Sequence, residues 1–276
     1  MLIDIIKTIL LGIIEGVTEW LPVSSTGHLI LLNDLLKLNV SDAFWEMFSV
    51  VIQLGAIMAV VVLYFSRLNP LSRKKSTEEQ KRTLRLWMLV VLAVIPSGVV
   101  GVLFDDFFDK HFTNSPTVAI ALIAYGIIFI ILEKYANTSN EVDTPEALTT
   151  KQALGIGLFQ VLSIIPGTSR SGSTMIGGML CGSSRSAAAE FSFFMAIPTM
   201  LGYSLLKLAK LFLEGTAVAM HEWIILIVGC ATAFLVSLVV ISGLIGFVRK
   251  HTFLPFGIYR IVLGCIVFGV YILQKA

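Results

Sequence analysis

Long apolar runs dominate the chain, and short charged or polar segments separate them. Residues 86–104 and 223–248 contain no Asp, Glu, Lys or Arg. An α-helix needs about 20 mostly apolar residues to cross the hydrocarbon core of a bilayer. The pattern therefore predicts six transmembrane helices, over about residues 44–66, 85–104, 116–134, 188–211, 223–248 and 254–274.

Two further segments, 5–37 and 152–183, have a different pattern. In each, a stretch rich in Pro, Gly and Ser separates two apolar arms. Irregular backbone at membrane depth is tolerated only where it is buried in protein or lines a water-filled cavity. We therefore expect each segment to form a re-entrant helical hairpin. The predicted fold class is an all-α polytopic membrane protein with six transmembrane helices plus two re-entrant helical hairpins.

The order of these elements occurs twice along the chain. In each half a broken segment precedes three apolar spans, and Phe48-Ser49 of the first half recurs as Phe191-Ser192 in the second. We interpret residues 1–276 as a single integral membrane domain with two repeats, about 1–135 and 150–276. Three spans per half give the repeats opposite orientations, which is the inverted topology of proteins whose sites lie near the bilayer midplane. One hairpin would then enter from each side, so that their tips meet.

Composition and charge agree with a membrane protein and orient it. Hydrophobic residues make up 56% of the chain and charged residues 14%, whereas soluble domains carry about 25% charge. The net charge of +2 is too small to indicate a nucleic-acid partner. Lys and Arg are concentrated in residues 67–85, which predicts that this loop is cytoplasmic. Residues 105–109, residues 214–222 and both termini would then lie outside.

Around its break, the first broken segment carries the acids Glu15 and Glu19, the hydroxyls of Ser24, Ser25 and Thr26, and the imidazole of His28. Ionisable groups are costly inside a bilayer and so indicate a functional site. The two acids are four residues apart, hence on one helix face, where like charges repel. A bound cation, a shared proton or Arg170 would relieve that repulsion. The hydroxyls are expected to cap the second arm, whose N-terminus attracts anions. The imidazole is a candidate acid, base or nucleophile.

The second broken segment contains the run Pro166-Gly167-Thr168-Ser169-Arg170-Ser171-Gly172. Its small residues allow backbone amides to approach a phosphate closely, and its guanidinium can bind phosphate oxygens in pairs. A structural alternative is that Arg170 neutralises Glu15 or Glu19. Together the two segments supply acids, alcohols and a guanidinium, a combination suited to phosphate chemistry.

Polar residues elsewhere in the apolar spans are weaker signals. Gln53 is expected either to support the residues of the site or to hydrogen-bond between helices. In the broken segments, Ser24 and Thr168 are expected to support the site, without an assigned role in catalysis. Arg185 and Glu190 are expected to pair near the membrane face. Arg260 lies about one turn into the last span. Its side chain is expected either to extend so that the charge reaches the membrane–water interface or to form an ion pair.

Four blocks of the sequence carry a resemblance to a known family: EGVTEWLPVSSTGH, PGTSRSGST, VIQLGAI and GSSRSAAAEFSFFMAIP. With them the chain closely resembles the bacterial undecaprenyl-diphosphate phosphatase, or bacitracin-resistance, family over almost its whole length. The resemblance implies hydrolysis of the C55 lipid diphosphate to the monophosphate at the outer face of the bacterial cytoplasmic membrane. This reaction recycles the lipid carrier for cell-wall synthesis and confers bacitracin resistance. It also implies dependence on a divalent cation, Mg²⁺ or Ca²⁺. The family's functional positions correspond to Glu15, Glu19, Ser25, Thr26, His28, Ser169 and Arg170.

These positions give an expected mechanism. Ser25 is the expected nucleophile, with Glu19 or His28 taking its proton, while the two acids Glu15 and Glu19 are candidate metal ligands. The phosphoryl oxygens would be held by Thr26, Ser169, Arg170 and Ser171. A metal-activated water and a His28 nucleophile stay open as alternatives.

The expected partners are a polyprenyl diphosphate and membrane lipids, without nucleic acid; the sequence leaves the oligomeric state open. Inverted repeats with broken helices are also a transporter architecture, so a transporter or lipid flippase is the rival interpretation. A structural membrane protein or channel would explain the spans but not the buried ionisable residues.

Overall fold

The computed structural model describes residues 1–135, 142–215 and 217–275, and it is helical almost throughout. Six helices are long and apolar enough to cross a membrane. They are α3 (Asp42–Leu63), α5 (Thr77–Phe112), α6 (Ser115–Tyr135), α9 (Arg185–Leu213), α10 (Met220–Val248) and α11 (Leu254–Lys275). Each coincides with a predicted span, so the all-α polytopic membrane class is confirmed.

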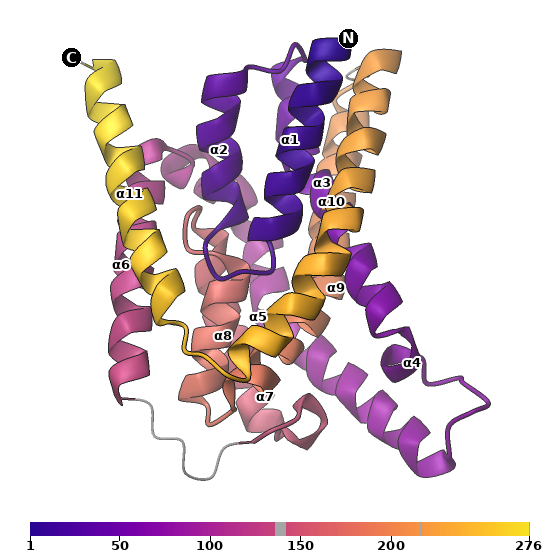
Figure 1. The fold of residues 1–276 in the computed structure, drawn as a ribbon. Coiled ribbons are helices and arrows are strands. Elements are labelled where there is room, and N and C mark those ends of the chain that lie inside the picture. The colour runs from indigo at the N-terminus through magenta and orange to yellow at the C-terminus, as the bar shows by residue number, and fades with distance from the viewer. Residues whose placement is uncertain (136–141, 216, 276) are drawn as a thin grey trace.

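Two pairs of shorter helices form hairpins between the long ones. The first pair is α1 (Leu2–Thr18) and α2 (Ser25–Leu36), and the second is α7 (Thr150–Val161) and α8 (Arg170–Leu180). Figure 1 shows that the pairs enter the bundle from opposite ends and turn back about halfway along it. The remaining elements are short: α4 (Phe65–Leu68), η1 (Pro145–Ala147) and η2 (Leu162–Ile164).

The hairpins turn at loops that we call the first tip (residues 19–24) and the second tip (residues 165–169). Each tip ends in a serine with a left-handed backbone, Ser24 with φ 70° and Ser169 with φ 72°. The Ser24 hydroxyl accepts the N–H of Gly27 at 3.3 Å, and the Ser169 hydroxyl accepts the N–H of Gly172 at 3.1 Å. Both serines therefore act as N-caps and start the returning helix in the same way.

Helix packing follows the same scheme in both halves. Helix α1 packs on α10 as α7 packs on α5, and α3 contacts α10 as α9 contacts α5. The corresponding helices α3 and α9 contact each other, as do α6 and α11. This correspondence supports the predicted repeats; their exact limits, 1–135 and 150–276, stay a prediction.

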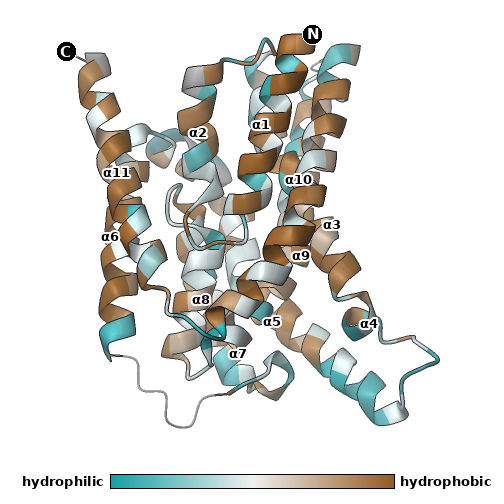
Figure 2. Ribbon diagram, viewed as in Figure 1, coloured by the Kyte–Doolittle hydropathy of each residue, from teal (hydrophilic) through white to brown (hydrophobic). Residues whose placement is uncertain are grey.

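Hydrophobic residues make up most of α6, α10 and α11, as Figure 2 shows. On α10, the large side chains Val239 and Ile227 are 74% and 66% exposed. Apolar surface of this extent on successive turns is typical of a helix that faces lipid rather than water. Both termini lie at one end of the bundle, and the connection from α4 to α5 lies at the other (Figure 1).

Close helix crossings depend on glycine. A Cβ atom built on Gly55 of α3 would lie 2.1 Å from the carbonyl oxygen of Cys230 on α10, and one on Gly157 of α7 would lie 2.1 Å from that of Ala93 on α5. Packing of small residues allows membrane helices to approach each other in this way. These two crossings fix the long helices against which the tips are placed.

Gly55→Ala is therefore expected to force α3 and α10 apart and to destabilise the protein by about 1–3 kcal/mol, the usual cost of overpacking. Thermal unfolding in detergent, followed by size-exclusion chromatography, measures the effect. Gly101→Ala on α5 is the matched control, because a Cβ there meets nothing within 4 Å. Equal melting temperatures for the two variants would contradict the packing argument.

Ion pairs fasten the end opposite the termini. Arg67 binds Glu146 at 2.6 Å and Glu190 at 2.6 Å, and Arg185 binds Glu133 at 2.5 Å. The expected pairing of Arg185 with Glu190 is wrong, because each has a partner on another element. Burial raises the pKa of the Glu146 carboxyl, but hydrogen bonds from Arg67 outweigh burial and hold that pKa below its ordinary value. The Arg67–Glu190 and Arg185–Glu133 pairs join the two predicted halves.

Candidate active site

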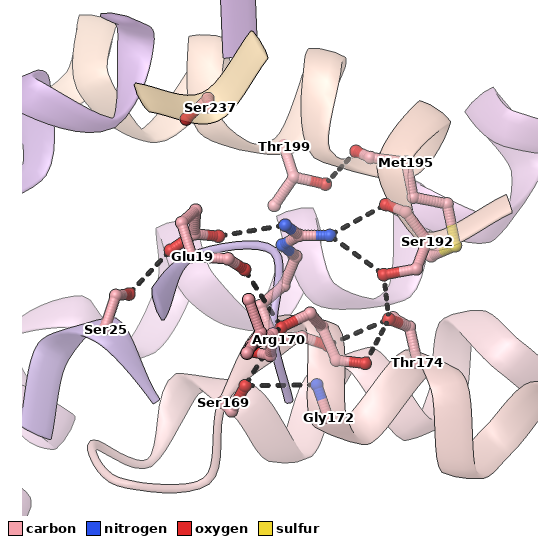
Figure 3. A network of polar contacts seen from close by, with 12 residues as sticks. Glu19, Ser25, Ser169, Arg170, Gly172, Thr174, Ser192, Met195, Thr199 and Ser237 are labelled. Carbon is pink, nitrogen blue, oxygen red and sulfur yellow. Dashed lines mark hydrogen bonds and ion pairs between the residues drawn. The ribbon is translucent and has the colours of Figure 1, made fainter. Parts of the chain in front are cut away.

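The two tips meet through Glu19, Ser25 and Arg170, which Figure 3 shows together. The Ser25 hydroxyl donates a hydrogen bond of 2.6 Å to Oε2 of Glu19. The other carboxylate oxygen, Oε1, lies 2.9 Å from Nη2 of Arg170. Glu19 is only 4% exposed, so this pairing takes place away from bulk water. The predicted alternative in which Arg170 neutralises an acid thus applies to Glu19.

Arg170 is held from a third direction by α9. Its Nη1 donates to the carbonyl oxygen of Ser192 at 2.7 Å and lies 3.1 Å from the Ser192 hydroxyl. The Thr174 hydroxyl binds the same Ser192 hydroxyl at 2.6 Å. Sequence reasoning did not assign Ser192 or Thr174 to the site. The signal available for Ser192 was its place in the repeated Phe-Ser pair of an otherwise apolar helix.

The serines beside Arg170 connect the tips. The Ser171 hydroxyl lies 3.0 Å from the carbonyl oxygen of Glu19 and 3.1 Å from that of Leu21, both in the first tip. It is also 3.1 Å from the hydroxyl of Ser169. Because Ser169 caps α8 and Ser24 caps α2, the positive ends of two helix dipoles are directed toward this junction. The junction therefore favours a bound anion.

Glu15 lies one helical turn before Glu19 and is fully buried. Neither of its carboxylate oxygens has a hydrogen-bond partner among the residues that the structure describes. Both oxygens of Glu19, in contrast, are engaged. Within the described part of the chain no three His, Cys, Asp or Glu residues gather as a metal site. A cation here would thus have Glu15 as its free protein ligand and would share its remaining ligands with water or an anion.

The His28 ring is engaged away from Ser25. Its Nδ1 lies 2.7 Å from the carbonyl oxygen of Ser24, and its Nε2 lies 2.7 Å from the hydroxyl of Tyr259 on α11. A carbonyl oxygen only accepts hydrogen bonds, so Nδ1 carries the proton. In the neutral ring, Nε2 then accepts a hydrogen bond from the Tyr259 hydroxyl. Of the two bases expected for Ser25, the structure therefore brings Glu19 into hydrogen-bond contact.

The other predicted residues lie at varied distances from this network. Thr26 is exposed on the first turn of α2, and Thr168 is buried in the second tip. Gln53 is half-buried on α3 and hydrogen-bonds to none of the described residues. Thr26 therefore remains available to a ligand, and the supporting role expected for Gln53 stays a prediction.

Arg260 is the largest departure from expectation. It is fully buried, so the prediction that its charge extends to the interface is wrong. Its guanidinium instead donates to backbone carbonyls of both tips, among them Pro22 at 2.9 Å and Gly167 at 2.9 Å. Those acceptors lie far away in sequence, and for this reason the position of Arg260 within its own helix gave no sign of them.

A multi-pass membrane protein with a buried acid–alcohol–guanidinium site between two hairpins is the class that the fold and the site define. Comparisons with known proteins agree. Residues 8–266 match the family described as "Bacitracin resistance protein BacA", and the chain belongs to that family. The resemblance found in the sequence blocks is thereby confirmed.

Curated relatives align with nearly the whole chain. "Undecaprenyl-diphosphatase 1" of Clostridioides difficile is 54% identical over 272 residues, covering 99% of this chain and 98% of the relative. "Undecaprenyl-diphosphatase" of Enterococcus faecalis is 53% identical over 264 residues, covering 95% and 96%. A relative of that name from Streptococcus agalactiae is 53% identical over 265 residues, covering 96% and 95%.

Proposed function

We propose that this protein hydrolyses undecaprenyl diphosphate to undecaprenyl phosphate and inorganic phosphate. The reaction recycles the lipid carrier for cell-wall synthesis and confers bacitracin resistance. The observation that carries the proposal is the position of the Ser25 hydroxyl, 2.6 Å from one carboxylate oxygen of Glu19. The other oxygen of the same carboxylate is paired with Arg170. This is a nucleophile with a base, and the base is oriented by a third group. The names of the relatives agree with this activity.

The substrate's diphosphate would bind between the tips. Arg170 and the N–H groups at the start of α8 would hold the terminal phosphoryl oxygens, with the hydroxyls of Ser169 and Ser171 beside them. Thr26 is exposed on the first turn of α2 and would donate from the other side. The anion would then lie against two helix N-termini, and its polyprenyl tail would leave between helices into the lipid.

Chemistry would begin with attack of the Ser25 oxygen on the terminal phosphorus, while the serine proton passes to Glu19. The bond between that phosphorus and the bridging oxygen breaks, and undecaprenyl phosphate leaves. Glu19 passes the serine proton to the departing phosphate oxygen and is again a carboxylate. Water then attacks the phosphoserine and gives a proton to Glu19. The bond between phosphorus and the Ser25 oxygen breaks, and Glu19 returns the proton to that oxygen as phosphate leaves. Direct attack by water and attack by His28 are the two alternative routes. Within this proposal, Glu19 acts as a general base.

A divalent cation, Mg²⁺ or Ca²⁺, is part of the proposal. The unpaired oxygens of buried Glu15 fit such an ion, with Glu19 as the second candidate ligand. When bound, the ion supplies positive charge to the phosphate oxygens and relieves the repulsion between the two acids. Activity should therefore fall when a chelator is added.

We further propose where the site lies in the cell. The protein belongs in the bacterial cytoplasmic membrane, with both hairpins re-entrant and the site opening to the outer side. Support comes from Lys and Arg in the loop between α4 and α5, because basic loops favour the cytoplasmic face. A flippase would need two compartments, so hydrolysis by purified protein in detergent separates the enzyme from that rival.

The test of the mechanism is to trap the covalent intermediate with substrate labelled at its terminal phosphate. Rapid quenching is expected to give acid-stable label on the wild-type protein and none on Ser25→Ala. Ser242→Ala is the control, since that serine is exposed on α10 and binds only its own helix. Label on the protein that is acid-labile and base-stable would instead indicate His28 as the nucleophile. Phosphate release without any label on the protein would indicate direct attack by water.

A further inference from the structure

Arg260 contacts both tips with one side chain. From α11, its Nη1 donates to the carbonyl of Pro22 in the first tip at 2.9 Å. Its Nη2 donates to Gly167 at 2.9 Å and to Thr168 at 3.0 Å in the second tip. These acceptors come from opposite halves of the chain. The guanidinium is therefore a direct bridge between the two tips, separate from the Glu19–Arg170 pair.

The charge of Arg260 has no acidic partner in the described part of the chain. The acceptors of its guanidinium are backbone carbonyls, and the ring of Tyr125 lies 5.5 Å from its Cζ atom. A buried cation is costly unless polar groups compensate it, and an apolar side chain would fill the same volume without that cost. Core packing alone thus does not explain an arginine here, whereas the need to hold several carbonyls at once does.

We propose that Arg260 is a positioning residue that keeps the two tips in register for catalysis; this inference rests on the proposed phosphatase function. A planar peptide directs its C=O and the following N–H in opposite directions. With the Thr168 carbonyl held by Arg260, the N–H of Ser169 must point away from Arg260. The same hold fixes the backbone immediately before Arg170.

The first turn of α8 lies directly against the guanidinium. A Cβ atom on Gly172 would be 3.3 Å from Nη1 of Arg260. The positive charge of Arg260 therefore adds to the positive end of the α8 dipole, where the phosphate is proposed to bind. Arg260 thus fixes both the geometry of the anion site and its charge.

Tyr259, the neighbour of Arg260, fastens the first hairpin at a second point. Its hydroxyl lies 2.7 Å from Nε2 of His28, and the two rings are parallel with centroids 5.7 Å apart. Since His28 also binds the carbonyl of Ser24 at 2.7 Å, α11 reaches the backbone next to Ser25 through this histidine. In this arrangement both ring nitrogens of His28 are engaged, and the ring supports the first tip.

The test compares Arg260→Met, Arg260→Lys and the control Arg249→Met by kinetics in detergent. Misplacement of reacting groups by an ångström lowers rates by about 100-fold, so kcat of Arg260→Met should fall by about that factor, with a smaller change in KM. Arg260→Lys keeps the charge but lacks the planar fork, and should recover about 10-fold. Arg249 is 62% exposed and lies 3.7 Å from Glu190, so its replacement should leave kcat unchanged.

A second measurement reads the tips directly. Spin labels on Thr26→Cys and Leu162→Cys, in a chain whose native cysteines are replaced, report by pulsed EPR the distance between the start of α2 and the η2 turn that precedes the second tip. The distance distribution should be broader in Arg260→Met than in the wild-type protein. In Arg260→Lys its width should lie between those two. Both labelled positions are exposed, so the labels fit without repacking.

The outcomes separate the inference from the proposed function. Normal kcat in Arg260→Met, or lost activity with an unchanged distance distribution, would overturn the positioning role. If Arg260→Met fails to fold, Arg260→Lys carries the test and must show both an intermediate kcat and a broader distribution. Wild-type protein that hydrolyses no lipid diphosphate would instead refute the phosphatase function, and the EPR result would still report whether Arg260 holds the tips.

Discussion

Replacement of Glu19 by Gln is expected to lower kcat for undecaprenyl diphosphate hydrolysis by about 1,000-fold, within the range for loss of a general base. The amide keeps the size of the carboxylate but cannot take the proton of Ser25, which lies 2.6 Å away. It also removes the charge that pairs with Arg170 at 2.9 Å. The effect should lie mainly in kcat, because the phosphate ligands of α8 are untouched.

Phosphate release from the purified variant measures this loss. Glu190→Gln is the matched control, since Glu190 is also a buried glutamate paired with an arginine, Arg67, and neither of these two side chains hydrogen-bonds to a tip. It should lose stability and retain its turnover per folded molecule. Near-normal kcat in Glu19→Gln would remove Glu19 from the proton transfer and favour another base.

Arg170→Ala is expected to lower kcat/KM by at least about 1,000-fold, because an arginine that stabilises a transferring phosphoryl group contributes about 10³–10⁵. The substitution removes the phosphate clamp and leaves Glu19 buried without its cation. The protein should still insert and fold, since the apolar helix contacts remain. Arg170→Lys should recover only a small part, because an ammonium cannot bind two oxygens in the same plane.

Turnover and size-exclusion profiles of the same samples separate activity from folding. Arg67→Ala serves as the control, because Arg67 also pairs with glutamates, Glu146 and Glu190, but its guanidinium hydrogen-bonds to neither tip. A folded Arg170→Ala protein with normal turnover would show that the guanidinium does not hold the phosphate.

Hydropathy was sufficient to predict the six spans, because exposure to lipid requires apolar residues along the whole crossing. It could not predict how far a helix extends beyond the membrane. Helix α5 runs over Thr77–Phe112, whereas the predicted span was about 85–104. Its start is set by a capping box between Ser76 and Glu79 in the charged loop, a local hydrogen-bond signal that hydropathy does not measure.

At the site, the sequence indicated which groups are costly to bury but not which partners compensate them. The pairing of Arg170 with an acid was among the predictions because both segments are polar. The choice of Glu19 over Glu15, and the contacts of Arg260 with both tips, depend on packing between elements far apart in sequence. Ser192 and Tyr259 were missed for the same reason: their partners in the site, Arg170 and His28, come from other segments of the chain.

The ion pair between Glu19 and Arg170 joins the residue directly after one helical arm to the first residue of another, across the two halves of the chain. An α-helix turns by about 100° for each residue. Insertion or deletion of a single residue in α1 would thus swing Glu19 away from its partner while leaving the composition almost unchanged. The length of this arm is consequently under tighter constraint than the identity of most of its side chains, and natural variation in chain length should be confined to the connections outside the hairpins.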